Sequence, residues 1–86
     1  MRNITFTPGA YADYIDWLKT DKKLFTKITN LIREAAKTPS EGTGKPELLK
    51  HDYSGHWARR INKEHRLVYK ATEESVKIVS CKYHYK

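Results

Sequence analysis

The spacing of apolar residues changes at an irregular stretch near the middle of the chain, and this change limits the fold more than any other feature. Residues 38–46 carry Pro39, Gly42, Gly44 and Pro46. Before this stretch apolar side chains recur at the spacing of a helix, and after it they alternate with polar ones, as on a strand. The whole chain of 86 residues is therefore predicted to form one domain with a helical first half and a strand-rich second half.

The first half is predicted to begin with a short strand over residues 2–7 and to continue as two helices. Large apolar residues recur at helical spacing over residues 10–19 and again over residues 22–37, with polar residues opposite in the second segment. Pro8 suits the first turn of the first helix, and Asp21 suits the N-cap of the second. Two helices joined by so short a turn are expected to form a hairpin whose apolar stripes pack in the core.

The second half is predicted to contain strands over residues 48–52, 56–62, 66–71 and 75–83. Short turns separate them, so these strands should pair as an antiparallel meander. The order β-α-α-β-β-β-β predicts an α+β fold, in which a curved, mainly antiparallel sheet packs against the N-terminal helical hairpin. The helices should cover one sheet face and leave the other open, and functional side chains are expected on the open face.

Basic residues dominate the charge of the chain. Seventeen Lys and Arg residues against ten Asp and Glu residues give a net charge of +7. This excess predicts an anionic partner, most often nucleic acid and sometimes a membrane surface or an acidic protein. A basic protein without such a partner is the alternative. No apolar run approaches the roughly 20 residues that span a bilayer, and no signal peptide is evident, so the protein is expected in the cytoplasm.

Cys81 is the single cysteine, which excludes an internal disulfide and a paired-cysteine zinc site. It lies in an apolar run and is expected to be a small core residue. The histidines and carboxylates form no recognisable ligand set, so neither a metal nor another cofactor is expected. His51 and His56 are expected to be strand or turn residues, and His65 is assigned no role.

Two arginines are predicted to face each other across a hairpin. If residues 62–64 form its loop, Arg60 pairs with Arg66 and both project from one face. Two like charges in this arrangement destabilise a sheet unless an anion lies between them, and the fork of Arg matches phosphate geometry. The pair is therefore interpreted as a phosphate clamp. The alternative is that each arginine pairs with a glutamate of a neighbouring turn, and the spacing alone favours neither.

The end of the chain combines a histidine with aromatic residues. Alternation along the last strand would place Lys82 and His84 on one side, and Tyr83 and Tyr85 on the other. A histidine can give or take a proton at cellular pH, and tyrosines can stack on unpaired bases. The alternative is a frayed terminus whose tyrosines pack on the sheet edge.

Glu47 is a lone carboxylate between Lys45 and Lys50. Neighbouring cations favour its ionised form, which a general base requires, although a surface ion pair is the commoner use of such a residue. RNA carries its own nucleophile, the 2′-hydroxyl, and cleavage needs a base, an acid and cations on the transition state. With His84 as acid and the arginine pair on the phosphate, these residues are interpreted as a metal-independent RNA-cleaving site.

Four blocks of the sequence together resemble the YoeB/Txe branch of the RelE/ParE toxin superfamily. They read EGTGKPELLKH (41–51), SGHWARRI (54–61), EHRLVY (64–69) and CKYHY (81–85). The resemblance extends over essentially the whole chain. It implies a toxin of a bacterial toxin–antitoxin operon, an endonuclease that enters the ribosomal A site, cuts the mRNA there and halts translation.

The resemblance also implies roles for individual residues. Glu47 would be the general base, His84 the general acid, and Arg66 the group that stabilises the scissile phosphate. Lys50 and Arg60 would hold the RNA backbone, and Tyr85 would stack on a base near the cut.

The implied partners are mRNA, the ribosome and an antitoxin whose acidic, disordered C-terminal segment would cover the basic face. A homodimer is common in this branch. Members commonly end at the His-Tyr pair, whereas Lys86 follows here and moves the terminal carboxylate by one residue.

Two other functions compete with this interpretation. ParE-like members use the same fold against DNA gyrase and lack the combination of Glu47, Arg66 and His84 that this chain has. A purely RNA-binding module would need the basic residues, but the negative charge of Glu47 would weaken its binding.

Overall fold

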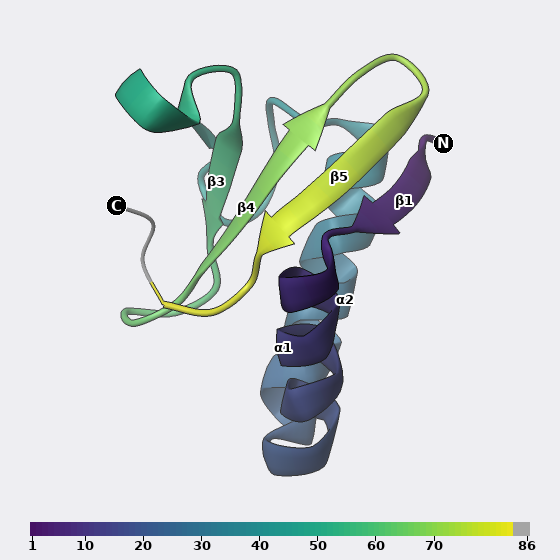
Figure 1. Ribbon diagram of the computed structural model, residues 1–86, viewed down its shortest axis with the longest axis vertical. Coiled ribbons are helices and arrows are strands. Elements are labelled where there is room, and N and C mark those ends of the chain that lie inside the picture. The colour runs from purple at the N-terminus through teal and green to yellow at the C-terminus, as the bar shows by residue number, and fades with distance from the viewer. Residues whose placement is uncertain (84–86) are drawn as a thin grey trace.

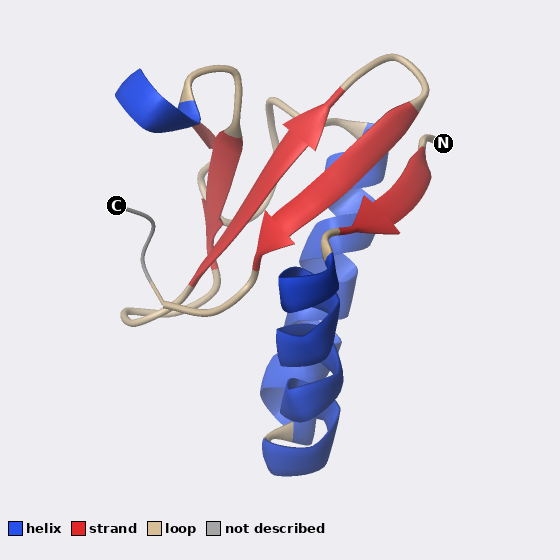
Figure 2. Ribbon diagram, viewed as in Figure 1, coloured by secondary structure: helices blue, strands red, loops and turns tan. Residues whose placement is uncertain are grey.

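The computed structural model describes residues 1–83 and contains two helices, one 3-10 turn and five strands. In chain order they are β1 (Asn3–Phe6), α1 (Pro8–Thr20), α2 (Lys22–Lys37), β2 (Glu47–Leu48), η1 (His51–Tyr53), β3 (Trp57–Arg60), β4 (Arg66–Ala71) and β5 (Ser75–Ser80). The strands form one sheet in the order β1-β5-β4-β3-β2. β1 is parallel to β5 and the other neighbours are antiparallel (Figures 1 and 2). The predicted α+β fold is confirmed.

The helical hairpin forms because its ends are capped by residues that the sequence supplies. Thr7 accepts a hydrogen bond from the backbone N–H of Ala10, and Pro8 occupies the first turn of α1, where its missing N–H costs nothing. Asp21 donates its own N–H to the end of α1 and accepts one from Leu24 at the start of α2. One residue thus ends one helix and begins the next, which confirms the predicted turn. No helix within residues 1–83 combines the length and apolar character needed to cross a bilayer.

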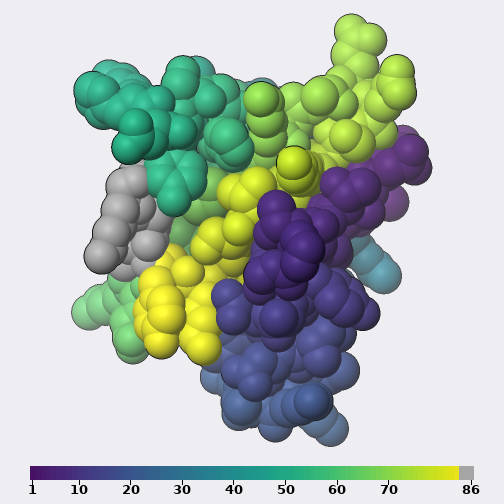
Figure 3. Space-filling view, viewed as in Figure 1, coloured from purple at the N-terminus to yellow at the C-terminus, as the bar shows by residue number. Residues whose placement is uncertain are grey.

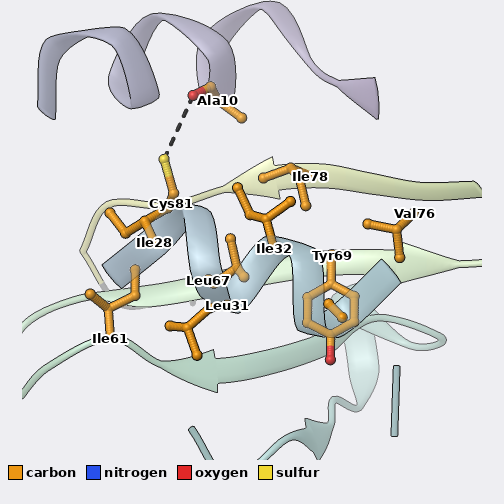
Figure 4. Close-up of a cluster of buried hydrophobic side chains, with 11 residues drawn as sticks. Ala10, Ile28, Leu31, Ile32, Ile61, Leu67, Tyr69, Val76, Ile78 and Cys81 are labelled. Carbon is orange, nitrogen blue, oxygen red and sulfur yellow. Dashed lines mark hydrogen bonds between the residues drawn. The ribbon is translucent and has the colours of Figure 1, made fainter. Parts of the chain in front are cut away.

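The main core lies between the helices and one face of the sheet (Figure 4). Its fully or almost fully buried members include Ile28, Leu31 and Ile32 of α2, Leu67 and Tyr69 of β4, and Val76 and Ile78 of β5. Cys81 belongs to this core, as predicted, and its thiol contacts the carbonyl oxygen of Ala10 at 3.6 Å. Burial raises the pKa of this thiol to about 12, so it stays protonated in the folded protein.

The predicted strand over residues 48–52 is wrong in most of its length. The strand β2 ends at Leu48, and His51, with a φ of 58°, turns the chain into η1. The turn brings Tyr53 against Leu49 and Val68, which are buried on the sheet face away from the helices. That face was expected to be open. It carries an apolar patch, however, and a turn that covers this patch is more favourable than an extended strand over residues 48–52. Figure 3 shows the region of η1 in teal, away from the helices.

The last predicted strand is shorter than expected. β5 ends at Ser80 rather than residue 83, after an irregularity in its pairing at Val68 and Tyr69. The predicted alternation of Lys82 and Tyr83 across two faces is also wrong. Tyr83 has a φ of 61°, and the ammonium of Lys82 lies 5.4 Å from its ring centroid, so the two side chains lie together.

Candidate functional site

Three strands bring a carboxylate and two guanidinium groups to one face of the sheet. Arg60 of β3 is paired with Arg66 of β4, and Glu47 of β2 is paired with Ala58 of β3. Paired residues project to the same side of a sheet, as do residues two apart on one strand. Glu47, Arg60 and Arg66 therefore share the face opposite the helices. The predicted pairing of the two arginines is confirmed.

Arg66 is oriented by the turn that precedes it. Its Nη1 donates to the carbonyl oxygen of Asn62 at 2.6 Å and to that of His65 at 3.0 Å. Among residues 1–83, neither Arg60 nor Arg66 forms an ion pair with a glutamate of a neighbouring turn. The arginine pair is therefore not neutralised in the way that the alternative interpretation required. Two guanidinium groups on adjacent strands that no glutamate neutralises are chemically suited to bind a phosphate group.

The end of the described chain lies against the first residue of β4. The backbone N–H of Arg66 donates to the carbonyl oxygen of Tyr83 at 3.0 Å. The indole N–H of Trp17 donates to the carbonyl oxygen of Cys81, also at 3.0 Å. Two of the predicted site residues, His84 and Tyr85, follow Tyr83 in the sequence and lie outside the described residues, as does Lys86.

Among residues 1–83, two hollows border the shared face. One, of about 410 Å³, is lined by residues 47–53 and so contains both Glu47 and Lys50. The other, of about 390 Å³, contains Arg60, and its lining has no acidic side chain but the three further cations Lys27, Lys45 and Lys63. The structure thus places Lys50 with the predicted base, and Arg60 with a second cationic surface.

A residue that sequence reasoning missed fixes the loop before Glu47. Arg59, next to Arg60 on β3, points to the other face and is fully buried. Its guanidinium donates four hydrogen bonds, to the hydroxyl of Tyr69 and to the carbonyl oxygens of Thr38, Glu41 and Thr43. Side chains alternate along a strand, so the adjacent arginines of this strand had to point to opposite faces. This alternation could therefore have identified Arg59 from the sequence as the arginine on the helix side of the sheet.

Glu34 and Gly42, which lie around Arg59, also hold the loop of residues 38–46 in place. Glu34 of α2 lies 3.5 Å from the Arg59 guanidinium and accepts the backbone N–H of Thr43 at 2.5 Å. The hydrogen bond from Thr43, with Arg59 nearby, lowers the pKa of this carboxyl below its usual 4.5. A Cβ at Gly42, whose φ is 116°, would meet the Glu34 carboxylate at 1.9 Å. The left-handed φ strains any other residue, and its Cβ would also displace the Glu34 carboxylate, so glycine suits the position.

Tyr69 connects the same network to the start of the loop. Its hydroxyl accepts from Arg59 and donates to the carbonyl oxygen of Pro39 at 2.5 Å. Burial raises the pKa of this phenol, so it remains a donor. One arginine, one carboxylate and one phenol thereby set the path of residues 38–46 into β2. Among residues 1–83, no group of three or more His, Cys, Asp or Glu side chains is placed to hold a metal ion.

Comparison with known proteins gives one consistent result. A family described as the YoeB-like toxin of bacterial type II toxin–antitoxin systems matches residues 6–85. The toxin YoeB of Escherichia coli K12 is 53% identical over 82 residues, which are 95% of this chain and 98% of that protein. A chain of the heterotetrameric YoeB–YefM toxin–antitoxin complex of Staphylococcus aureus superposes with a TM-score of 0.89, at 48% identity over 99% of both chains. The YoeB dimer of S. aureus superposes with a TM-score of 0.90, at 48% identity over 98% of both chains.

Proposed function

The chain belongs to the family of YoeB-like toxins of bacterial type II toxin–antitoxin systems, and we propose that it is a ribosome-dependent mRNA endonuclease. It cleaves mRNA in the ribosomal A site in the cytoplasm and thereby stops translation. The observation that carries this proposal is the shared sheet face, on which Glu47 lies beside the paired Arg60 and Arg66. A binding module needs the cations of this face but has no use for its carboxylate.

The proposed reaction is an attack by the 2′-hydroxyl of the RNA on the adjacent phosphorus. Glu47 takes the proton of that hydroxyl, and the new bond from the 2′-oxygen forms as the bond to the 5′-oxygen breaks. His84 gives a proton to the departing 5′-oxygen. The products are a 2′,3′-cyclic phosphate and a 5′-hydroxyl, so the reaction consumes no water, metal or other cofactor.

The arginines stabilise the charge that develops on the phosphorane-like transition state. Arg66 is preorganised for this task, because two carbonyl oxygens fix its Nη1 before RNA binds. Arg60 and Lys50 hold the RNA backbone on either side, from the two hollows that flank the site. Tyr85 stacks on a base near the cut.

The proposed partners follow from the charge and from the relatives. An antitoxin with an acidic C-terminal segment covers the basic face, since the net charge of this chain is +7 and opposite charges favour such an interface. The S. aureus relative forms a complex with YefM and also a dimer. We propose an antitoxin complex and a homodimer for this chain as well.

Mapping of cleavage on a translated mRNA tests the proposal. Wild-type protein should produce cuts in register with the reading frame in a primer-extension assay. Glu47→Gln should lower the cleavage rate by about 100-fold or more, because a general base contributes that much, while ribosome binding persists. Glu73→Gln removes the same charge from a remote exposed turn and should cleave like wild type. Equal cleavage by wild type and Glu47→Gln would exclude Glu47 as the base.

A further inference from the structure

His65 is a buried histidine to which the proposed reaction gives no role. The residue is 7% exposed and lies in the turn between β3 and β4. Its ring centroid lies 4.9 Å from that of Trp17 and 5.5 Å from that of Tyr83. The turn fixes its backbone, because Asn62 accepts its N–H at 2.8 Å and its carbonyl oxygen accepts the N–H of Ile61 at 3.0 Å. The ring therefore has a defined place.

The ring binds the last described residue of the chain. The backbone N–H of Tyr83 donates to Nδ1 of His65 at 2.7 Å. A backbone N–H can only donate, so Nδ1 carries no proton, and the proton of the neutral ring is on Nε2. A lone buried polar group would be costly without a partner. This histidine meets that requirement by binding the backbone of another segment.

The segment that His65 binds has an unusual backbone conformation. Tyr83 has a φ of 61°, a left-handed conformation that is unfavourable for a bulky L-residue. Such conformations persist only where the surroundings impose them, and they gather at functional sites. Here Tyr83 is held from both sides, its N–H by His65 and its carbonyl oxygen by the N–H of Arg66. The two holding groups belong to adjacent residues, the last of the turn and the first of β4.

We propose that His65 is a positioning residue for the end of the chain that carries the general acid. The inference rests on the proposed function, in which His84 is that acid. His65 fixes the N–H of Tyr83, the residue directly before His84, and the backbone of Arg66 fixes the carbonyl oxygen of Tyr83. The turn that orients the Arg66 guanidinium therefore also sets the direction in which the chain continues from Tyr83. The same two adjacent residues thus hold the backbone of Tyr83, which directly precedes the proposed acid, and one of them carries the guanidinium proposed to bind phosphate.

Two substitutions separate this role from packing. His65→Leu keeps an apolar body in the pocket but removes the acceptor. His65→Asn places a carbonyl oxygen where Nδ1 lies. We expect His65→Leu to lower kcat of ribosome-bound mRNA cleavage by about 10- to 100-fold, as small misplacements of reacting groups do. KM should stay unchanged, and His65→Asn should restore most of kcat. A loss of kcat that is equal in both variants, or a change in KM alone, would overturn the proposal.

Nuclear magnetic resonance tests the anchor without any activity. In the wild-type protein the nitrogen shifts of His65 should show a proton on Nε2 and none on Nδ1. The amide of Tyr83 should be protected from hydrogen exchange, and this protection should be lost in His65→Leu and kept in His65→Asn. Undiminished protection in a folded His65→Leu variant would refute the anchor. If the wild type shows the anchor but cuts no mRNA, the proposed function fails instead.

Discussion

Two segments lead the chain to the proposed site, and they are held in different ways. Residues 38–46, which end at Glu47, are held by the buried, charged guanidinium of Arg59 through three backbone carbonyl oxygens. Residues 81–83 are held by the neutral rings of Trp17 and His65, through one hydrogen bond each. The first anchor is fully buried, whereas the second holds the chain where it leaves the core after Cys81. Glu47, the proposed base, therefore follows a segment that a buried cation fixes, whereas residues 81–83, which precede the proposed acid, are held by single hydrogen bonds to neutral rings.

Removal of the charged anchor is expected to have the largest effect. Arg59→Met leaves the buried carbonyl oxygens of the loop without donors and the Glu34 carboxylate without its cation. Losing one partner of a buried charged network costs about 3–5 kcal/mol of unfolding free energy, which is a large share of the stability of so small a domain. Urea denaturation measures this loss.

The adjacent Arg60→Met is the matched control for that measurement. Arg60 is exposed on the opposite face, so its substitution should change the unfolding free energy by no more than about 0.5 kcal/mol. Similar losses in the two variants would show that Arg59 does not anchor the loop.

Weakening the neutral anchor should open only the end of the chain. Trp17→Phe keeps a ring beside His65 but removes the donor to Cys81, and should cost about 1 kcal/mol. Burial raises the pKa of Cys81 to about 12, so its thiol reacts with a disulfide reagent at pH 8 only after opening. The labelling rate of Cys81 should rise more in Trp17→Phe than the loss of global stability accounts for. A rise that matches the global loss would mean that the segment opens only with the whole protein.

Substitution of Glu34, the carboxylate beside Arg59, is expected to have the smallest effect on the unfolding free energy. The side chain of Glu34 is 33% exposed, so Glu34→Gln should cost less than about 1 kcal/mol at neutral pH. Its pKa is lowered below 4.5, mainly by the Thr43 hydrogen bond. A carboxyl with a depressed pKa stabilises the folded state above its unfolded pKa and loses that contribution as the pH falls through the folded pKa. Thermal unfolding of wild type and Glu34→Gln should differ at pH 6 and converge at acidic pH, and a constant difference would contradict this.

The sequence predicted those parts of the molecule that follow from local patterns. The helical hairpin followed from apolar spacing and from Asp21 as a cap. The Arg60–Arg66 pair followed from the length of one turn. The α+β order followed from the change of spacing at residues 38–46. The place of Cys81 followed from its apolar neighbours.

The features that were predicted wrongly or missed depend on contacts between residues distant in the sequence. Arg59 binds carbonyl oxygens 16 to 21 residues away, and no local pattern names such partners. The expected strand over residues 48–52 gave way to η1 because Leu49 and Val68 need a cover. His65 binds Tyr83 across 18 residues. The catalytic roles of Glu47, Arg66 and His84 were inferred from residue chemistry and assigned individually by the family resemblance, and they stay predictions.

In the proposed reaction the 2′-hydroxyl of the mRNA is the nucleophile and Glu47 activates it. The most direct measurement uses mRNA with a single 2′-deoxy nucleotide on the 5′ side of the mapped cut, bound in the ribosomal A site. We expect the wild-type protein to leave this RNA intact and to cut the matched all-ribose RNA to a 2′,3′-cyclic phosphate. Cleavage of the 2′-deoxy RNA at the same position would contradict the proposed reaction.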